Sequence, residues 1–140
     1  MMGGKNLANT NVKAEFIILG DSFEPIDVTT KLGLDPTQVW RTGDVTKTPG
    51  FTHKETCWMI GTDFEKSYDV NDQLSQLVDL LKDKVPGINE LRNTNEIECM
   101  FFLIINIEKN EIPAMYFRRE FLEFLNSIGA ELHIDQYIFS

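Results

Sequence analysis

The residue types best suited to binding a ligand are concentrated in residues 35–44, at a predicted junction between a strand and a loop, where binding sites are commonly built. Arg41 could hold a carboxylate or a phosphate through two parallel hydrogen bonds. Trp40 and the more distant Trp58 could supply flat walls, since tryptophan favours half-buried positions. The candidate binding residues are Thr37, Trp40, Arg41, Gly43, Asp44 and Trp58.

A purely structural explanation is open for the same residues. Asp44 could bond to the backbone of the turn, Arg41 could pair with a surface carboxylate, and Trp40 could belong to the core. The polar loop that follows, residues 42–54, contains a Pro-Gly pair that marks a bend. This loop could be either a hairpin loop or a mobile flap.

Nucleophilic and metal chemistry have little support in the sequence. His53 and His133 are the two histidines, and neither has a cysteine or an aspartate at the spacing of a zinc site. Cys57 and Cys99 lie in apolar stretches, where a cysteine usually packs as a small hydrophobic residue with a reduced thiol. A zinc site or a Cys57–His pair would have to be assembled by the fold alone. We therefore expect no metal and no cofactor.

Other catalytic motifs are also not supported. Neither GxGxxG nor GxxxxGK[ST], the two glycine-rich patterns that cradle phosphates, occurs in the chain. Carboxylate pairs such as Glu131 and Asp135 are abundant in so acidic a chain, and most are expected to be solvated at caps and loop ends. The sequence identifies no catalytic residue, and it leaves open whether the protein is an enzyme, with a non-enzymatic role favoured.

The overall charge restricts the partners of this chain. It has 22 acidic and 13 basic residues, which give a formal net charge of −9 at pH 7. Such a charge repels the phosphate backbone of nucleic acids, and no stripe of lysine or arginine reverses it locally. An acidic surface suits a basic protein partner, although solubility alone would also account for it.

Length and composition indicate a single globular domain. A chain of 140 residues with 42% hydrophobic and 25% charged residues fits one domain of ordinary size. Residues 1–12 are polar and read as a flexible tail, which leaves residues 13–140 for the α+β domain. We find no secretory signal, and the longest apolar run, residues 97–107, is about half a membrane span. We expect a cytoplasmic protein that does not enter a membrane.

The elements that would position the candidate residues follow from the hydrophobic pattern. Apolar, β-branched stretches predict strands, and apolar residues spaced by four predict helices. The helix over residues 70–84 is expected to have Asp69 as its N-cap and to end at Pro86-Gly87. Strands are expected at residues 14–19, 38–41, 56–62, 97–107 and 131–139, and helices at residues 26–32, 70–84 and 118–128.

These elements predict an α+β fold in the order β-α-β-β-α-β-α-β. The first six match the ferredoxin-like order β-α-β-β-α-β, to which a helix and a strand are added. Each predicted helix has a single apolar stripe, so we expect the helices to pack on one face of a mostly antiparallel sheet. Residues 97–107 are apolar almost throughout, which places that strand near the centre of the sheet.

Two groups of residues resemble a known bacterial family. The first comprises Phe16-x-Ile18, Gly20-Asp21, Pro25-x-x-Val28-Thr29-x-x-Leu32-Gly33-Leu34-x-Pro36-Thr37, Gly43-Asp44 and Trp58. The second comprises Phe121-Leu122-x-Phe124-Leu125-x-x-Ile128-Gly129-Ala130-x-Leu132-x-Ile134-Asp135-x-Tyr137. Over nearly the whole chain after the tail, these residues resemble the bacterial domain-of-unknown-function family numbered forty-two seventy-nine. The resemblance implies a small cytosolic α+β protein and carries over no catalytic residue.

Two functional hypotheses follow. The first is a non-enzymatic protein-interaction module that binds a basic protein, as an inhibitor or immunity-type partner would, through its acidic surface and the region of Trp40, Arg41 and Asp44. The second is a small-molecule-binding protein or weak enzyme, with a pocket between the sheet and loop 42–54 near those residues and Trp58. A structural component of an oligomer is a third possibility, and the sequence leaves the oligomeric state open.

Overall fold

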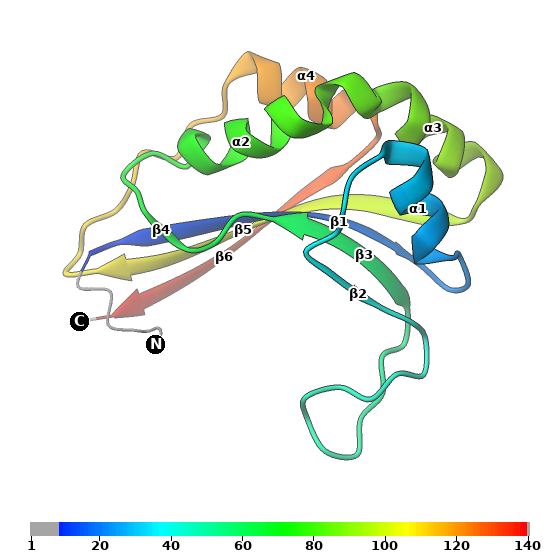
Figure 1. Ribbon diagram of the computed structural model, residues 1–140. Coiled ribbons are helices and arrows are strands. Elements are labelled where there is room, and N and C mark those ends of the chain that lie inside the picture. The colour runs from blue at the N-terminus through cyan, green and yellow to red at the C-terminus, as the bar shows by residue number, and fades with distance from the viewer. Residues whose placement is uncertain (1–8, 140) are drawn as a thin grey trace.

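A curved sheet with helices on one side of it makes up the fold in the computed structural model, which describes residues 9–139 (Figure 1). The strands form where apolar and β-branched residues either alternate with polar ones or run continuously. They are β1 (Asn11–Gly20), β2 (Gln38–Trp40), β3 (Thr56–Gly61), β4 (Glu65–Lys66), β5 (Ile97–Glu108) and β6 (Glu131–Phe139).

The strands lie in the order β2-β3-β1-β5-β6, and the short β4 pairs with the beginning of β1. All pairs are antiparallel except β5 with β6, which is parallel. The α+β class and the mostly antiparallel sheet are therefore confirmed. The ferredoxin-like order stays a prediction, because β4 and one further helix interrupt the expected sequence of elements.

The helices lie together on one side of the sheet (Figure 1). The first has Pro25 in its first turn, where a missing N–H costs no hydrogen bond, and it ends at Gly33 in the left-handed conformation, with φ of 66°. The N-cap of the second is Val70 rather than the expected Asp69, whose side chain accepts a hydrogen bond from the Asn71 N–H at 2.9 Å just before the helix. The helices are α1 (Pro25–Leu32), α2 (Asn71–Leu81), a 3-10 turn (Lys82–Lys84), α3 (Val85–Thr94) and α4 (Arg119–Ser127).

The main core lies between the helices and the sheet. Phe16 of β1 and Phe101 of β5 pack with ring centroids 5.2 Å apart, and Phe121 of α4 meets Phe101 edge-on at 5.3 Å. Burying one such ring contributes about 1.5–3 kcal/mol. Trp58 of β3 is also fully buried on this side. Aromatic contacts therefore hold the helices against the two central strands.

The helical region continues beyond the expected stop at Pro86-Gly87. Helix α3 starts directly after the 3-10 turn, and its proline occupies the first turn, where it is tolerated. Ile88 and Leu91 of α3 are buried in the core, and residues 89–94, for which no element was predicted, are helical. Helix α2 does end before Pro86-Gly87, at Leu81, but the sequence did not predict α3, because a proline that cannot continue one helix can begin the next.

Two smaller boundaries also differ from expectation. Asn11 and Val12, assigned from the sequence to the tail 1–12, are buried residues of β1, while residues 1–8 of that tail lie outside the described residues. The strand Glu65–Lys66 is too short to produce a recognisable pattern. Within residues 9–139, no helix has both the length and the apolar character needed to cross a bilayer.

Candidate functional site

Asp44 and Gly43 form the turn that follows β2. The Asp44 side chain accepts a hydrogen bond from the Arg41 N–H at 2.8 Å, and the Asp44 N–H donates to the Arg41 carbonyl at 3.0 Å. Gly43 has φ of 92°, a conformation that glycine adopts without a steric cost. The geometry of the turn is therefore sufficient to explain why these two residue types stand here.

Arg41 and Trp40 each have a partner at the surface. Arg41 Nη2 lies 3.0 Å from Glu24 Oε2, an exposed ion pair of the kind that adds little stability. The half-buried Trp40 ring stacks on His53, with centroids 4.3 Å apart. An anionic ligand of Arg41 would have to compete with Glu24 for the guanidinium group.

Trp58 and Thr37 occupy structural positions. The Trp58 ring is fully buried beneath the helices, and its Nε1–H donates a hydrogen bond to Thr29 Oγ1 at 3.0 Å. The Thr37 hydroxyl accepts a hydrogen bond from the Gly61 N–H at 3.0 Å, which ties the segment before β2 to the end of β3. Trp58 is therefore closed to solvent, and Thr37, although exposed, has its hydroxyl engaged in this backbone contact.

The two tryptophans lie on opposite faces of the sheet. Trp40 is the register partner of Cys57, the residue next to Trp58, and successive residues of a strand point to opposite faces. Trp40 packs with the apolar residues on the open face, and Trp58 packs under the helices. The structure therefore does not bring Trp58 together with Arg41 and Asp44, as a pocket between sheet and loop would require.

The loop 42–54 is a hydrogen-bonded hairpin that projects from the end of the sheet away from the helices (Figure 1). Val45 and Thr52 form a β-bridge, and the Thr46 N–H donates to the Phe51 carbonyl at 3.0 Å. The side chains of Val45 and Phe51 are exposed. Of the two forms considered for this loop, the structure shows a hairpin.

The two cysteines are free and buried. Desolvation raises the pKa of Cys57 to about 12, with a smaller contribution from the charges of Glu15 and Glu55, and burial raises the pKa of Cys99 to about 11. Both remain protonated thiols at neutral pH and are poor nucleophiles. Within the described part of the chain, no three histidine, cysteine or acidic residues are grouped to hold a metal ion.

Carboxylates gather at one end of the sheet. Glu98 of β5 is the register partner of Leu19 of β1, and both belong to the face opposite the helices. Asp21 directly follows β1, while Glu55 and Glu96 directly precede the two strands that pair with it, β3 and β5. Strand pairing thus collects four acidic residues that are distant in the sequence.

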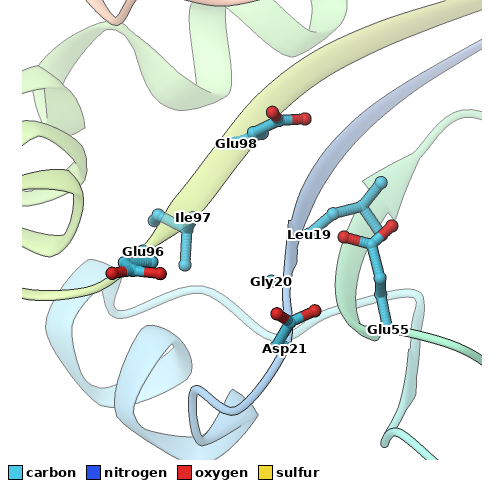
Figure 2. Close-up of a pocket in the computed structure, with 7 residues that line it drawn as sticks. All are labelled: Leu19, Gly20, Asp21, Glu55, Glu96, Ile97 and Glu98. Atoms are coloured by element: carbon cyan, nitrogen blue, oxygen red, sulfur yellow. The ribbon is translucent and has the colours of Figure 1, made fainter.

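These four side chains border a solvent-open depression of about 330 Å³ (Figure 2). Leu19, Gly20 and Ile97 complete its lining. All four acidic residues are exposed, and no ion pair among the described residues includes any of them. Because none of them is in an ion pair with a described residue, the four carboxylates make this end of the sheet a region of negative potential. They are Asp21, Glu55, Glu96 and Glu98, and we call them the acidic rim.

An apolar surface adjoins the acidic rim. Ile17 and Met59 are buried on the open face, and Leu19, Trp40 and Phe102 pack against them as half-buried residues. Carboxylates beside apolar side chains complement a segment that carries both basic and apolar groups. The arrangement can hold cationic groups by charge, and its lining residues include no serine, threonine, cysteine, lysine or histidine.

Sequence reasoning missed the acidic rim. Each of its residues lies at or near the end of a predicted strand, which is a usable signal, but one that many acidic residues of this chain share. Which strand ends meet depends on the pairing of β1 with β3 and β5. That pairing joins residues far apart in the chain and cannot be derived from local patterns.

Comparison with known proteins identifies one match. A family model described as "Domain of unknown function (DUF4279)" matches residues 10–139, a range that includes every described strand and helix. This confirms the resemblance found in the two groups of residues. No curated protein and no solved structure matches the chain.

Proposed function

Because the chain belongs to the family described as domain of unknown function DUF4279, we infer its role from its own geometry and propose a non-enzymatic protein-interaction module that binds a basic protein. The observation that carries the proposal is the acidic rim beside the apolar open face. An inhibitor or immunity-type partner would use such a surface. We place the protein in the cytoplasm, where its two buried free cysteines would stay reduced.

The acidic rim and the net charge would act at different ranges. A formal charge of −9 attracts a basic partner during the diffusional encounter, and this attraction weakens as salt is added. At contact, lysine or arginine side chains would reach the unpaired carboxylates. Apolar residues of the same partner segment would cover Leu19 and Trp40, which are half-buried on the open face.

The rival hypothesis, a small-molecule site or weak enzyme near Trp40, Arg41 and Asp44, has less support. Trp58, its expected second wall, faces the helices. Asp44 is bonded to the turn backbone, and Arg41 is paired with a surface glutamate. The side chains of Asp44 and Arg41 are therefore already engaged, whereas the carboxylates of the acidic rim are in no ion pair within residues 9–139.

The test captures the partner at low salt and then measures its affinity for matched variants. The purified protein is immobilised on a support and incubated with a lysate of the source organism. The captured protein is identified and then titrated against the wild type and against Glu55→Gln/Glu96→Gln/Glu98→Gln. We expect the dissociation constant to rise by roughly tenfold or more. The control, Asp79→Asn/Asp83→Asn/Glu123→Gln, removes the same charge from exposed positions on the helical side.

The control separates a local site from overall charge. If the rim acts as a site, the control variant binds about as tightly as the wild type. Equal weakening by both variants would mean that only net charge matters, and it would contradict a role for the rim. A captured protein that is acidic, or binding that strengthens with salt, would contradict the proposal as a whole.

A further inference from the structure

Strand β6 leaves one edge of the sheet unpaired. It is nine residues long and pairs only with β5, through its inner edge. Among residues 9–139, no element covers its outer edge with backbone hydrogen bonds. Such an edge presents a row of free N–H and C=O groups that can template another strand. The opposite edge strand, β2, has three residues and offers a far shorter template.

Several side chains of β6 are large, apolar and exposed, which is unfavourable on an edge strand that has no partner. Ile138 is 70% exposed and Ile134 is 39% exposed, and both project on the helix side of the strand. Tyr137 and Phe139 are also exposed large side chains. Natural sheets usually protect such edges with charged side chains, above all lysine, with proline or with a bulge. Strand β6 has no lysine, proline or bulge, and its acidic residues are Glu131 and Asp135.

We propose that two copies of this chain pair antiparallel through β6, with Gln136 on the two-fold axis, to form one continuous sheet. A two-fold axis perpendicular to the sheet keeps the helices of both copies on one side and pairs residues of the same face. Ile134 then lies opposite the second copy's Ile138, and His133 lies opposite its Phe139. Directly opposed apolar pairs of this kind stabilise antiparallel strands.

Charge and coverage select this register over its neighbours. A shift that centres the pair on Asp135 places two aspartates directly opposite each other, which is unfavourable. A shift that centres it on Tyr137 leaves Ile134 with no opposite residue in the second copy's β6, although Ile134 is 39% exposed. With Gln136 at the centre, Asp135 faces Tyr137, and no carboxylate of β6 lies opposite another.

The proposal also has a salt signature of its own. Each copy carries a formal charge of −9, so long-range repulsion opposes association and is screened as salt is added. Pairing of two copies therefore tightens with salt, whereas binding of a basic protein at the acidic rim weakens. The two proposals can thus fail independently of each other.

The first measurement is the mass of the full chain in solution as a function of concentration, by analytical ultracentrifugation at moderate and high salt. We expect a reversible dimer for the wild type and a monomer for Ile138→Lys, because the substitution places a charge opposite Ile134 of the second copy. Ile26→Lys, on α1 at a site 61% exposed, is the matched control and should remain dimeric. A monomeric wild type at high concentration and high salt would overturn the proposal.

The register is tested by disulfide formation between copies. Gln136→Cys should cross-link to itself under mild oxidation, because directly opposed residues of antiparallel strands lie within disulfide range. Cys57 and Cys99 are buried and should not interfere. Asp135→Cys and Tyr137→Cys report the two neighbouring registers and should cross-link much less. Stronger cross-linking at either of these positions, or none at Gln136→Cys in a dimeric sample, would overturn the assignment.

Discussion

At the scale of single residues, Cys57 links the stability of the fold to alkaline pH. Burial raises its pKa to about 12, against 9.0 for an ordinary thiol. The unfolded chain therefore loses this proton first as pH rises, so the stabilisation is complete below about pH 9 and is lost as pH approaches 12. We expect Cys57→Ala to reduce the steepness with which the free energy of unfolding falls above pH 9, measured by urea titration at a series of pH values.

Cys99 provides the matched comparison, since its pKa is raised less, to about 11. Cys99→Ala should flatten the same curve over a narrower range of pH. Both wild-type thiols should also resist a thiol reagent in the native protein at neutral pH and react after unfolding. Parallel curves for the wild type and Cys57→Ala above pH 9 would show that the buried thiol is not responsible.

Single residue types indicated the right interactions but not the right faces. The suggestion that Asp44 bonds to its turn and Arg41 to a surface acid came from residue type alone, and the structure contains both contacts. Trp40 and Trp58 could not be separated in this way, because both stand next to apolar residues in predicted strands. Their assignment to opposite faces depends on the register of β2 with β3.

At the scale of elements, α3 shows how a local rule can mislead. Pro86 and Gly87 usually end helices, and no helix was predicted for the polar segment that follows them. The chain instead turns through Lys82–Lys84 and begins a new helix with the proline in its first turn. Tertiary burial of Ile88 and Leu91 supplies the stabilisation that local propensity lacks.

Ile88→Ala tests whether that packing holds α3 in place. The side chain is fully buried, so its truncation should lower the free energy of unfolding by about 2–5 kcal/mol, measured by urea denaturation. Asn93→Ala, at an exposed position of the same helix, should change it by less than about 0.5 kcal/mol. Similar small effects of both substitutions would indicate that α3 contributes little to the cooperative fold.

At the scale of the whole molecule, hydrophobic patterning predicted the class of the fold and the central place of β5, but not which surfaces would stay open. The nearly continuous apolar run of β5 does lie between β1 and β6. The helices lie on one side of the sheet (Figure 1), and the acidic rim is exposed while the outer edge of β6 has no strand partner among the described residues. Both surfaces arise from strand order, which joins residues distant in the chain and so escapes local analysis.

Four unpaired carboxylates held close together should reduce the stability of a chain that already carries a formal charge of −9. We expect Glu55→Gln/Glu96→Gln/Glu98→Gln to raise the melting temperature at low ionic strength, because it removes repulsion from the acidic rim. The gain should shrink at about 1 M salt, where the Debye length is about 3 Å. The control variant Asp79→Asn/Asp83→Asn/Glu123→Gln removes the same charge elsewhere. It should raise the melting temperature less, because it also breaks the Asp79–Lys82 ion pair. Equal shifts in the two variants, measured by calorimetry, would mean that the rim is not a local concentration of repulsion.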